Sequence, residues 1–211
     1  SFYYFLFWCL YYFAISEEDN ILFQFIQKLP QNKIIEGKSR IVSSSHAVIL
    51  SFFSTLYLIG IVDYSYWTSY LPICSSFGVF DLSLITYYYS IFKKGYIPTL
   101  VHHTLLIFGP MVLTPQNSYL MAQAFLFETT VPILDFNWYL YHINQRNSTL
   151  FKTNSLVSIL CFLIFRIANN CYLLMHSVKY SLIVQFISLL FLILNTYWFF
   201  NLIKLFVKHA L

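Results

Sequence analysis

Long apolar runs, each bounded by polar or basic residues, recur along the whole chain. The hydrocarbon core of a bilayer is about 30 Å thick, so a helix needs roughly 20 apolar residues to cross it. Only helices and closed barrels satisfy every backbone N–H and C=O group in lipid. We read about seven helical segments: Phe2–Ile15, His46–Val62, Leu71–Phe92, Ile97–Leu113, Tyr119–Ile143, Ser155–Met175 and Ser181–Val207. The sequence therefore predicts an all-α, polytopic transmembrane helix bundle of about six or seven spans.

Composition excludes several function classes. The chain is 59% hydrophobic and 9% charged, whereas soluble domains carry about 25% charged residues. The net charge of +4 comes from loops and forms no basic patch with interleaved aromatics, so nucleic acid is excluded as a partner. The four cysteines are scattered without metal-ligand spacing. We therefore expect no metal or cofactor, while protein partners and oligomeric state stay open.

Basic residues gather in alternate loops. The basic loops and the tail contain Lys28, Lys33, Lys38, Arg40, Lys93, Lys94, Arg146, Lys152, Lys204 and Lys208. The opposite loops, around Asp63–Tyr70 and Thr114–Ser118, contain no Lys or Arg, and the last contains only Lys179. Because cytoplasmic loops carry the excess of Lys and Arg, we expect the basic loops and the C-terminus to be cytoplasmic.

The N-terminal part is expected to differ from the rest. Phe2–Ile15 is short for a span, and we interpret it as a truncated one. The longest polar stretch, residues 16–45, is interpreted as a single loop. The hydroxyls of Ser43, Ser44 and Ser45 are expected to cap a helix that starts at His46, because Ser is a preferred N-cap residue. His46 would then be a structural histidine at the membrane interface.

Two adjacent histidines lie inside an apolar segment. His102 and His103 follow Ile97 by five and six residues, which places them roughly 8–9 Å inside the cytoplasmic boundary. Asp135 lies roughly 12 Å from the same boundary in the next segment. The histidines and Asp135 could therefore meet at a polar cavity open to the cytoplasm. An imidazole oriented by a carboxylate can act as a general base or nucleophile, which makes these three residues catalytic candidates.

Other ionisable or polar groups lie deeper in the spans. Glu128 and Arg166 both fall near the midplane, where opposite charges are natural partners, so we expect either a structural ion pair or a functional role. Glu128 and Asp135 are seven residues apart and share one helical face. Further polar residues of the spans are Asp81, Asn169, Asn170 and Asn195. We interpret these as lining a lipid cavity or as interhelical hydrogen-bonding groups.

The order of short motifs resembles the TLC domain, which the translocating-chain-associating membrane protein and the ceramide synthases share. Six stretches carry the resemblance in order: Ser39–Ala47, Phe80–Leu82, Val101–Leu106, Phe127–Leu134 with Asn137-Trp138, Phe165-Arg166 and Leu194–Phe199. The resemblance covers nearly the whole chain from Gly37 onward. It implies a TLC-type membrane domain over residues 37–211, preceded by an N-terminal span and cytoplasmic loop over residues 1–36.

The resemblance implies a lipid-handling protein of internal membranes, usually the endoplasmic reticulum. Ceramide synthases follow the paired His with two acids in the next span. Here Glu128 lies near the first of them, but Val131 lies where the second would be. We therefore expect a protein that binds, senses or regulates membrane lipids. The alternatives are an acyl-CoA-dependent lipid acyltransferase that uses the His pair, and a translocation or cargo accessory factor that works through its loops.

Overall fold

The computed structural model describes residues 2–15, 20–92 and 96–209, and every regular element in these ranges is a helix. The elements are α1 (Phe2–Ala14), α2 (Ile21–Gln27), η1 (Gln31–Lys33), α3 (Ile34–Leu58), α4 (Tyr64–Thr68), α5 (Leu71–Tyr87), α6 (Tyr89–Phe92), α7 (Tyr96–Phe108), η2 (Gly109–Val112), α8 (Ser118–Phe125), η3 (Leu126–Thr130), α9 (Val131–His142), α10 (Thr149–Phe162), η4 (Leu163–Ala168), α11 (Asn169–Ser177) and α12 (Leu182–His209). The predicted all-α class is confirmed for the described residues.

Four helical stretches are long and apolar enough to cross a membrane. They are Gln31–Leu58, Tyr64–Tyr87, Thr149–Ser177 and Leu182–Lys208. Two further apolar helices, Phe2–Ala14 and Tyr96–Val112, are shorter. The fold is therefore compatible with a membrane protein, and the count of six or seven spans stays a prediction.

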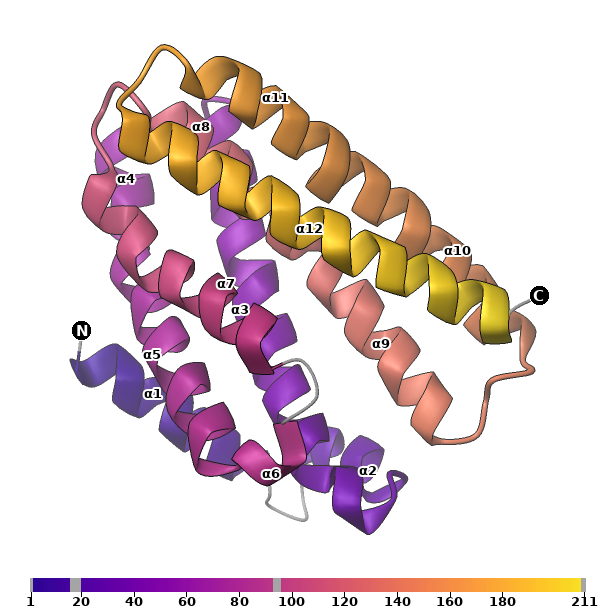
Figure 1. The fold of residues 1–211 in the computed structure, drawn as a ribbon. Helices are drawn as coiled ribbons and strands as arrows, with labels where there is room; N and C mark the ends of the chain where they lie inside the picture. Colours follow the sequence, from indigo (N-terminus) through magenta and orange to yellow (C-terminus); the bar gives the residue numbers. More distant parts are fainter. Residues whose placement is uncertain (1, 16–19, 93–95, 210–211) are drawn as a thin grey trace.

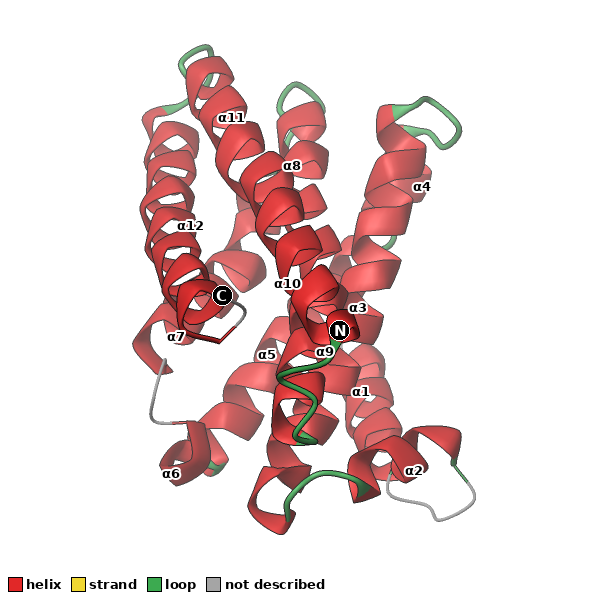
Figure 2. Ribbon diagram, turned by 90° about the vertical axis from the view of Figure 1, so that its right-hand side faces the viewer, coloured by secondary structure: helices red, strands yellow, loops and turns green. Residues whose placement is uncertain are grey.

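The helices run roughly along one another in a bundle (Figure 1). The α10–α11 column and α12 form an antiparallel pair that lies side by side in both ribbon views (Figures 1 and 2). Helix α3 contacts α1, α5, α8 and α9, so it lies at the centre of the bundle. Helices α2 and α6 lie at one end and α4 at the other.

Helix α3 begins twelve residues before the predicted start at His46. The interpretation of residues 16–45 as a single loop is therefore wrong, because α2, η1 and the first turns of α3 fall within it. Glu36 pairs with Lys33 at 2.8 Å and with Arg40 at 3.1 Å, and such (i, i+3) and (i, i+4) pairs stabilise a first helical turn. The polar residues that predicted a loop belong instead to the first turns of α3.

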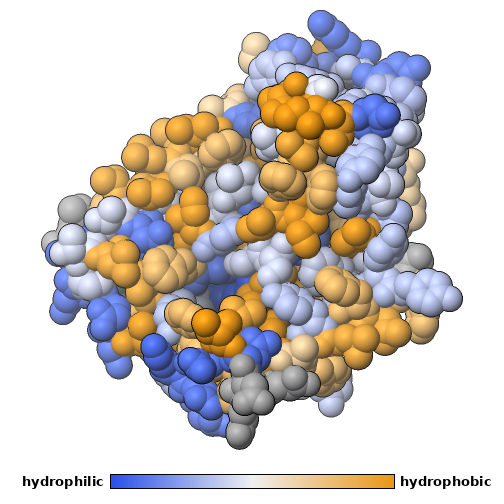
Figure 3. Space-filling model, turned by 180° about the vertical axis from the view of Figure 1, so that it is seen from behind, coloured by the Kyte–Doolittle hydropathy of each residue, from blue (hydrophilic) through white to orange (hydrophobic). Residues whose placement is uncertain are grey.

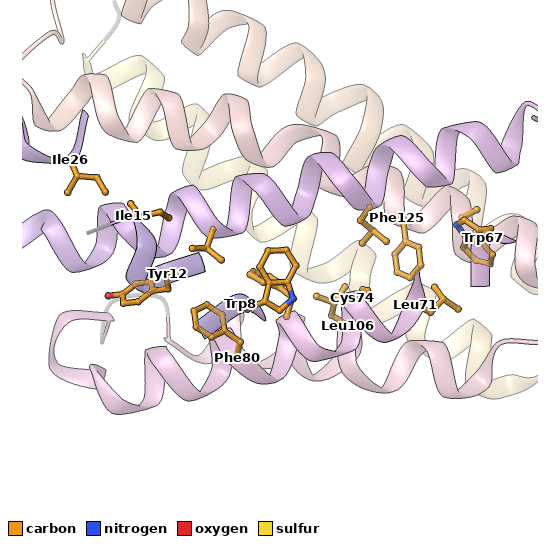
Figure 4. Packing of buried hydrophobic residues seen from close by; sticks show 14 residues of the cluster. Trp8, Tyr12, Ile15, Ile26, Trp67, Leu71, Cys74, Phe80, Leu106 and Phe125 are labelled. Atoms are coloured by element: carbon orange, nitrogen blue, oxygen red, sulfur yellow. The ribbon is translucent and has the colours of Figure 1, made fainter. Parts of the chain in front are cut away.

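Helix α1 belongs to the main hydrophobic core. Trp8 is fully buried, and its ring lies 5.4 Å from that of Phe77 on α5, with the planes at 72°. The indole N–H of Trp8 also donates to the carbonyl of Ile73 at 3.3 Å. The core cluster of Figure 4 extends from Ile26 past Trp8 to Trp67. The N-terminal segment thus packs as part of the same bundle as the residues after Gly37.

Helix α4 follows a loop residue that caps it. The side chain of Asp63 accepts from the backbone N–H of Tyr66 at 2.7 Å and from the hydroxyl of Ser65 at 2.9 Å. These hydrogen bonds favour the carboxylate, and they hold the pKa of Asp63 below its ordinary value. The cap defines where the chain turns from α3 into the α4–α5 column.

Two departures from α-helical geometry lie at the centre of the fold. The segment η3 is a 3₁₀ turn that precedes Pro132, a residue that cannot donate a backbone hydrogen bond. In η3 the N–H of Val131 bonds to the carbonyl of Glu128, and the carbonyl of Phe127 accepts from the hydroxyl of Thr130 at 3.0 Å. The segment η4 is a π-helical turn that contains Arg166. Such turns change the direction of side chains and recur at functional sites.

Candidate functional site

The paired histidines of α7 each face a different acid. Nε2 of His102 lies 3.4 Å from Oε1 of Glu128, and Nε2 of His103 lies 3.2 Å from Oδ2 of Asp81. Adjacent residues of a helix point about 100° apart, and the two imidazole planes here are 84° apart. The two carboxylates lie on η3 and α5, so α7 is joined to two separate parts of the bundle.

Asp135 does not meet the histidines, and that prediction is wrong. Its carboxylate lies 2.6 Å from Nη1 of Arg40 and accepts from the hydroxyl of Ser44 at 2.7 Å. Arg40 and Ser44 are available because they stand one turn apart on α3, in the part that the sequence analysis interpreted as a loop. Asp135 is therefore no longer a candidate for orienting His102 or His103.

His46 is a core residue in mid-helix, so its predicted interfacial position is wrong. It lies about 18 Å along α3 from Ile34, and its side chain is buried. The ring stacks on Phe77 with centroids 4.0 Å apart and planes at 12°. Neither ring nitrogen has a hydrogen-bond partner among the described residues. The serines before it do not cap a helix start, and Ser45 bonds instead to the carbonyl of Ile41 and to Tyr11.

Asp81 acts as an interhelical hydrogen-bonding group, as predicted. Besides facing His103, it accepts from the hydroxyl of Ser39 at 3.2 Å. All three side chains are buried. The cluster therefore joins α3, α5 and α7 near the level of Arg40.

Arg166 forms no ion pair with Glu128 within the described residues, so the predicted structural pair is wrong. Its Nε donates to the carbonyl of Phe127 at 3.0 Å and to the hydroxyl of Thr130 at 2.7 Å, and that hydroxyl itself donates to the same carbonyl at 3.0 Å. Its Nη1 donates to Oδ1 of Asn195 on α12 at 3.3 Å. The 3₁₀ turn exposes a carbonyl to Arg166, while the carboxylate of Glu128 faces His102.

The asparagines that follow Arg166 have different environments. Asn169 donates to the carbonyl of Gln123 at 2.8 Å and joins α11 to α8. Asn170 is completely buried, and both atoms of its amide lack a partner. A buried amide without a partner is costly. Asn170 therefore marks a place where another polar group, such as water or part of a ligand, can bind.

Asn170 lines a small cavity together with His102 and Glu128. The cavity measures about 60 Å³ and lies between α7, α8, α11 and α12. Its remaining walls are mostly apolar and extend past Gly109 to Asn117. The cavity thus leads away from the basic end of the bundle, and the predicted polar cavity open toward the cytoplasm stays a prediction.

Two larger grooves lie at the basic end, on either side of α9. One measures about 460 Å³ and lies between α9, α3 and α2. The other measures about 380 Å³ and lies between α9, α10 and α12. Arg40 and Trp138 line both grooves, and the Arg40 guanidinium stacks 4.6 Å from the indole centroid. Seen from behind, the molecule has a hollow in which hydrophilic residues lie among hydrophobic ones (Figure 3).

Sequence reasoning did not identify Arg40, Ser44 or Trp138 as site residues. The spacing of Glu36, Arg40 and Ser44 at four-residue intervals was the available signal, because it places all three on one helical face. The prediction of a loop over residues 16–45 hides this pattern, because a loop has no helical face.

No family model, curated protein or solved structure matches this chain. No group of three His, Cys, Asp or Glu side chains within residues 2–15, 20–92 and 96–209 has a geometry suited to a metal ion.

Proposed function

We propose that this chain is an integral membrane protein that binds a membrane lipid. One observation carries the proposal: the groove of about 460 Å³ has apolar walls from α2, α3 and α9 and a polar cluster of Arg40, Ser44 and Asp135. Ligand pockets of about 300–1,000 Å³ are typically apolar with a few placed polar groups. An amphipathic lipid has the same division between apolar chain and polar head.

The separation of Asp135 from the His pair favours binding over catalysis. His103 is buried against Asp81, and Val131 stands where ceramide synthases have their second acid. We extend the proposal to the TLC-type domain, to six or seven spans and to an internal membrane such as the endoplasmic reticulum. The order of the six motifs and the apolar helices supports this extension.

The groove can be tested by narrowing it. Ile41 lines the groove, and Ile41→Trp should reduce the lipid that co-purifies with the detergent-extracted protein, because the larger ring occupies the space of the ligand. Mass spectrometry of the bound lipids measures the loss. Val48→Trp is the matched control, since Val48 lies on the same helix and is 54% exposed. Equal lipid retention by the two variants would contradict the proposal.

A second candidate function is acyl transfer from acyl-CoA, and the geometry of His102 favours it specifically. The ring faces Glu128 and lines the small cavity beside Asn170. A carboxylate that orients one imidazole nitrogen leaves the other available as base or nucleophile.

The two candidates predict different behaviour of a histidine variant. His102→Asn keeps some hydrogen bonding but removes the basic imidazole. For a lipid-binding protein we expect the variant to fold and to retain its lipid, with no acylated product from either protein when acyl-CoA and a lipid amine are supplied. Product formation by the unchanged protein, abolished in His102→Asn but not in His176→Asn on the exposed end of α11, would establish the enzyme instead.

A further inference from the structure

We infer that the bound lipid is an anionic phospholipid with two acyl chains that straddles α9, with one chain in each groove and its head group at the basic mouths of the grooves. The inference rests on the proposed function and names the class of lipid. It follows from the arrangement of the grooves on α9, from their shared cation and from the charge at their mouths.

The two grooves use opposite faces of α9. Pro132, Asp135, Phe136 and Tyr139 line the groove on the α2 side. Their spacing of three and four residues places them on one face of the helix. The second face, which lines the groove on the α12 side, consists of Leu134, Asn137, Trp138 and Tyr141. The two sets are offset by two residues, or about 200° around the helix. Helix α9 therefore separates the two apolar grooves, so one acyl chain can lie on each side of it.

The two grooves meet at the same cation, Arg40. Arg40 and Trp138 are the residues common to both, and the side chain of Arg40 is 34% exposed. The guanidinium of Arg40 donates to Glu36 and Asp135, so Arg40 marks the place where the grooves meet, and further cations at the groove mouths attract the anionic head group. A glycerophospholipid branches in the same way as the two grooves, because one phosphate-bearing head group is joined to two acyl chains. The volumes of about 460 and 380 Å³ both fall in the range of roughly 300–1,000 Å³ that ligand pockets occupy.

The charge at the groove mouths favours an anionic head. Lys28 lies 5.6 Å from the ring centroid of Phe25, which lines one groove. Arg146 lies 3.8 Å from the ring centroid of Tyr141, which lines the other. In the described part of the chain neither cation forms an ion pair with a carboxylate, whereas Lys33, Glu36, Arg40 and Asp135 form a neutral chain of ion pairs. Among the described residues, the mouths thus carry an excess of positive charge.

Competition between an anionic and a zwitterionic lipid tests the preference for a negatively charged head group. Purified, delipidated protein receives equal amounts of phosphatidylglycerol and phosphatidylcholine with identical acyl chains, and native mass spectrometry measures the retained ratio. We expect phosphatidylglycerol to dominate. Lys28→Gln and Arg146→Gln should each lower the ratio about fivefold, the effect of one basic residue near an anionic lipid. Lys179→Gln, in the loop between α11 and α12, should leave the ratio unchanged.

A second measurement tests the two grooves. Leu205 lines the groove between α9 and α12 and is 52% exposed, so Leu205→Trp should narrow that groove without disturbing the core. We expect weaker retention of phosphatidylglycerol and unchanged retention of its single-chain lyso form, which needs only the other groove. Leu189→Trp, at a position of α12 that is 43% exposed and lines neither groove, is the matched control.

The outcomes separate this inference from the proposed function. Retention of both lipids in equal amounts by every variant would overturn the inference and leave lipid binding intact. Retention of no lipid by the unchanged protein would overturn both. A lipid-free dimer in the same spectra, disrupted by Leu205→Trp, would show that a second copy of the chain occupies the groove, and the inference would again be wrong.

Discussion

Replacing Arg166 with methionine is expected to lower the free energy of unfolding by about 1.5–3 kcal/mol, the usual contribution of hydrogen bonds that involve a charged group. Arg166 is buried and donates to the carbonyl of Phe127, to Thr130 and to Asn195. Methionine preserves much of the apolar stem but removes every one of these donors. It also removes a positive charge that interacts electrostatically with the buried carboxylate of Glu128.

Denaturant unfolding in mixed micelles, followed by circular dichroism, measures the effect. Arg146→Met is the matched control, because Arg146 is exposed and lies on a loop; surface substitutions of this kind usually stay within about 0.5 kcal/mol. A loss below about 1 kcal/mol for Arg166→Met, typical of an ordinary interhelical hydrogen bond in a membrane protein, would mean that the three donors do not stabilise the junction of η3, η4 and α12.

Trp8→Ala is expected to cost about 3 kcal/mol, the lower end of the range for large aromatic-to-alanine changes in a core. The indole is fully buried against Phe77 and His46 and donates to the carbonyl of Ile73. Its removal leaves a cavity whose walls lose their van der Waals contacts. We place the cost at the lower end because lipid is as apolar as the core, so the transfer contribution is reduced.

The same unfolding measurement applies to this second variant. Phe7→Ala is the control, since Phe7 precedes Trp8 on α1 but is 50% exposed. We expect a clearly smaller loss for Phe7→Ala. Similar losses for the two variants would mean that α1 does not pack on α5 through Trp8, and that the N-terminal segment is separable from the bundle.

The positions of most helices can be predicted from the sequence, because each helix forms through interactions within its own segment. An apolar run must satisfy its own backbone hydrogen bonds in lipid, and a helix does so within the segment. The apolar segments therefore correspond to α1, the later part of α3, the α5–α6 and α7–η2 columns, and the columns that end in α9, α11 and α12. The start of α3 was not predictable from apolar composition, because Ile34–Ser45 is polar and helical at once.

The sequence by itself also determined which polar residues matter, because a charged or amide group placed in an apolar segment must find a partner. Only the tertiary structure decided the partners. Asp135 faces Arg40, Glu128 faces His102, and Arg166 binds a carbonyl. The reason is geometric: partner choice depends on the rotation and depth of each helix, and the 3₁₀ turn of η3 and the π turn of η4 shift both in ways that a regular helical repeat does not describe.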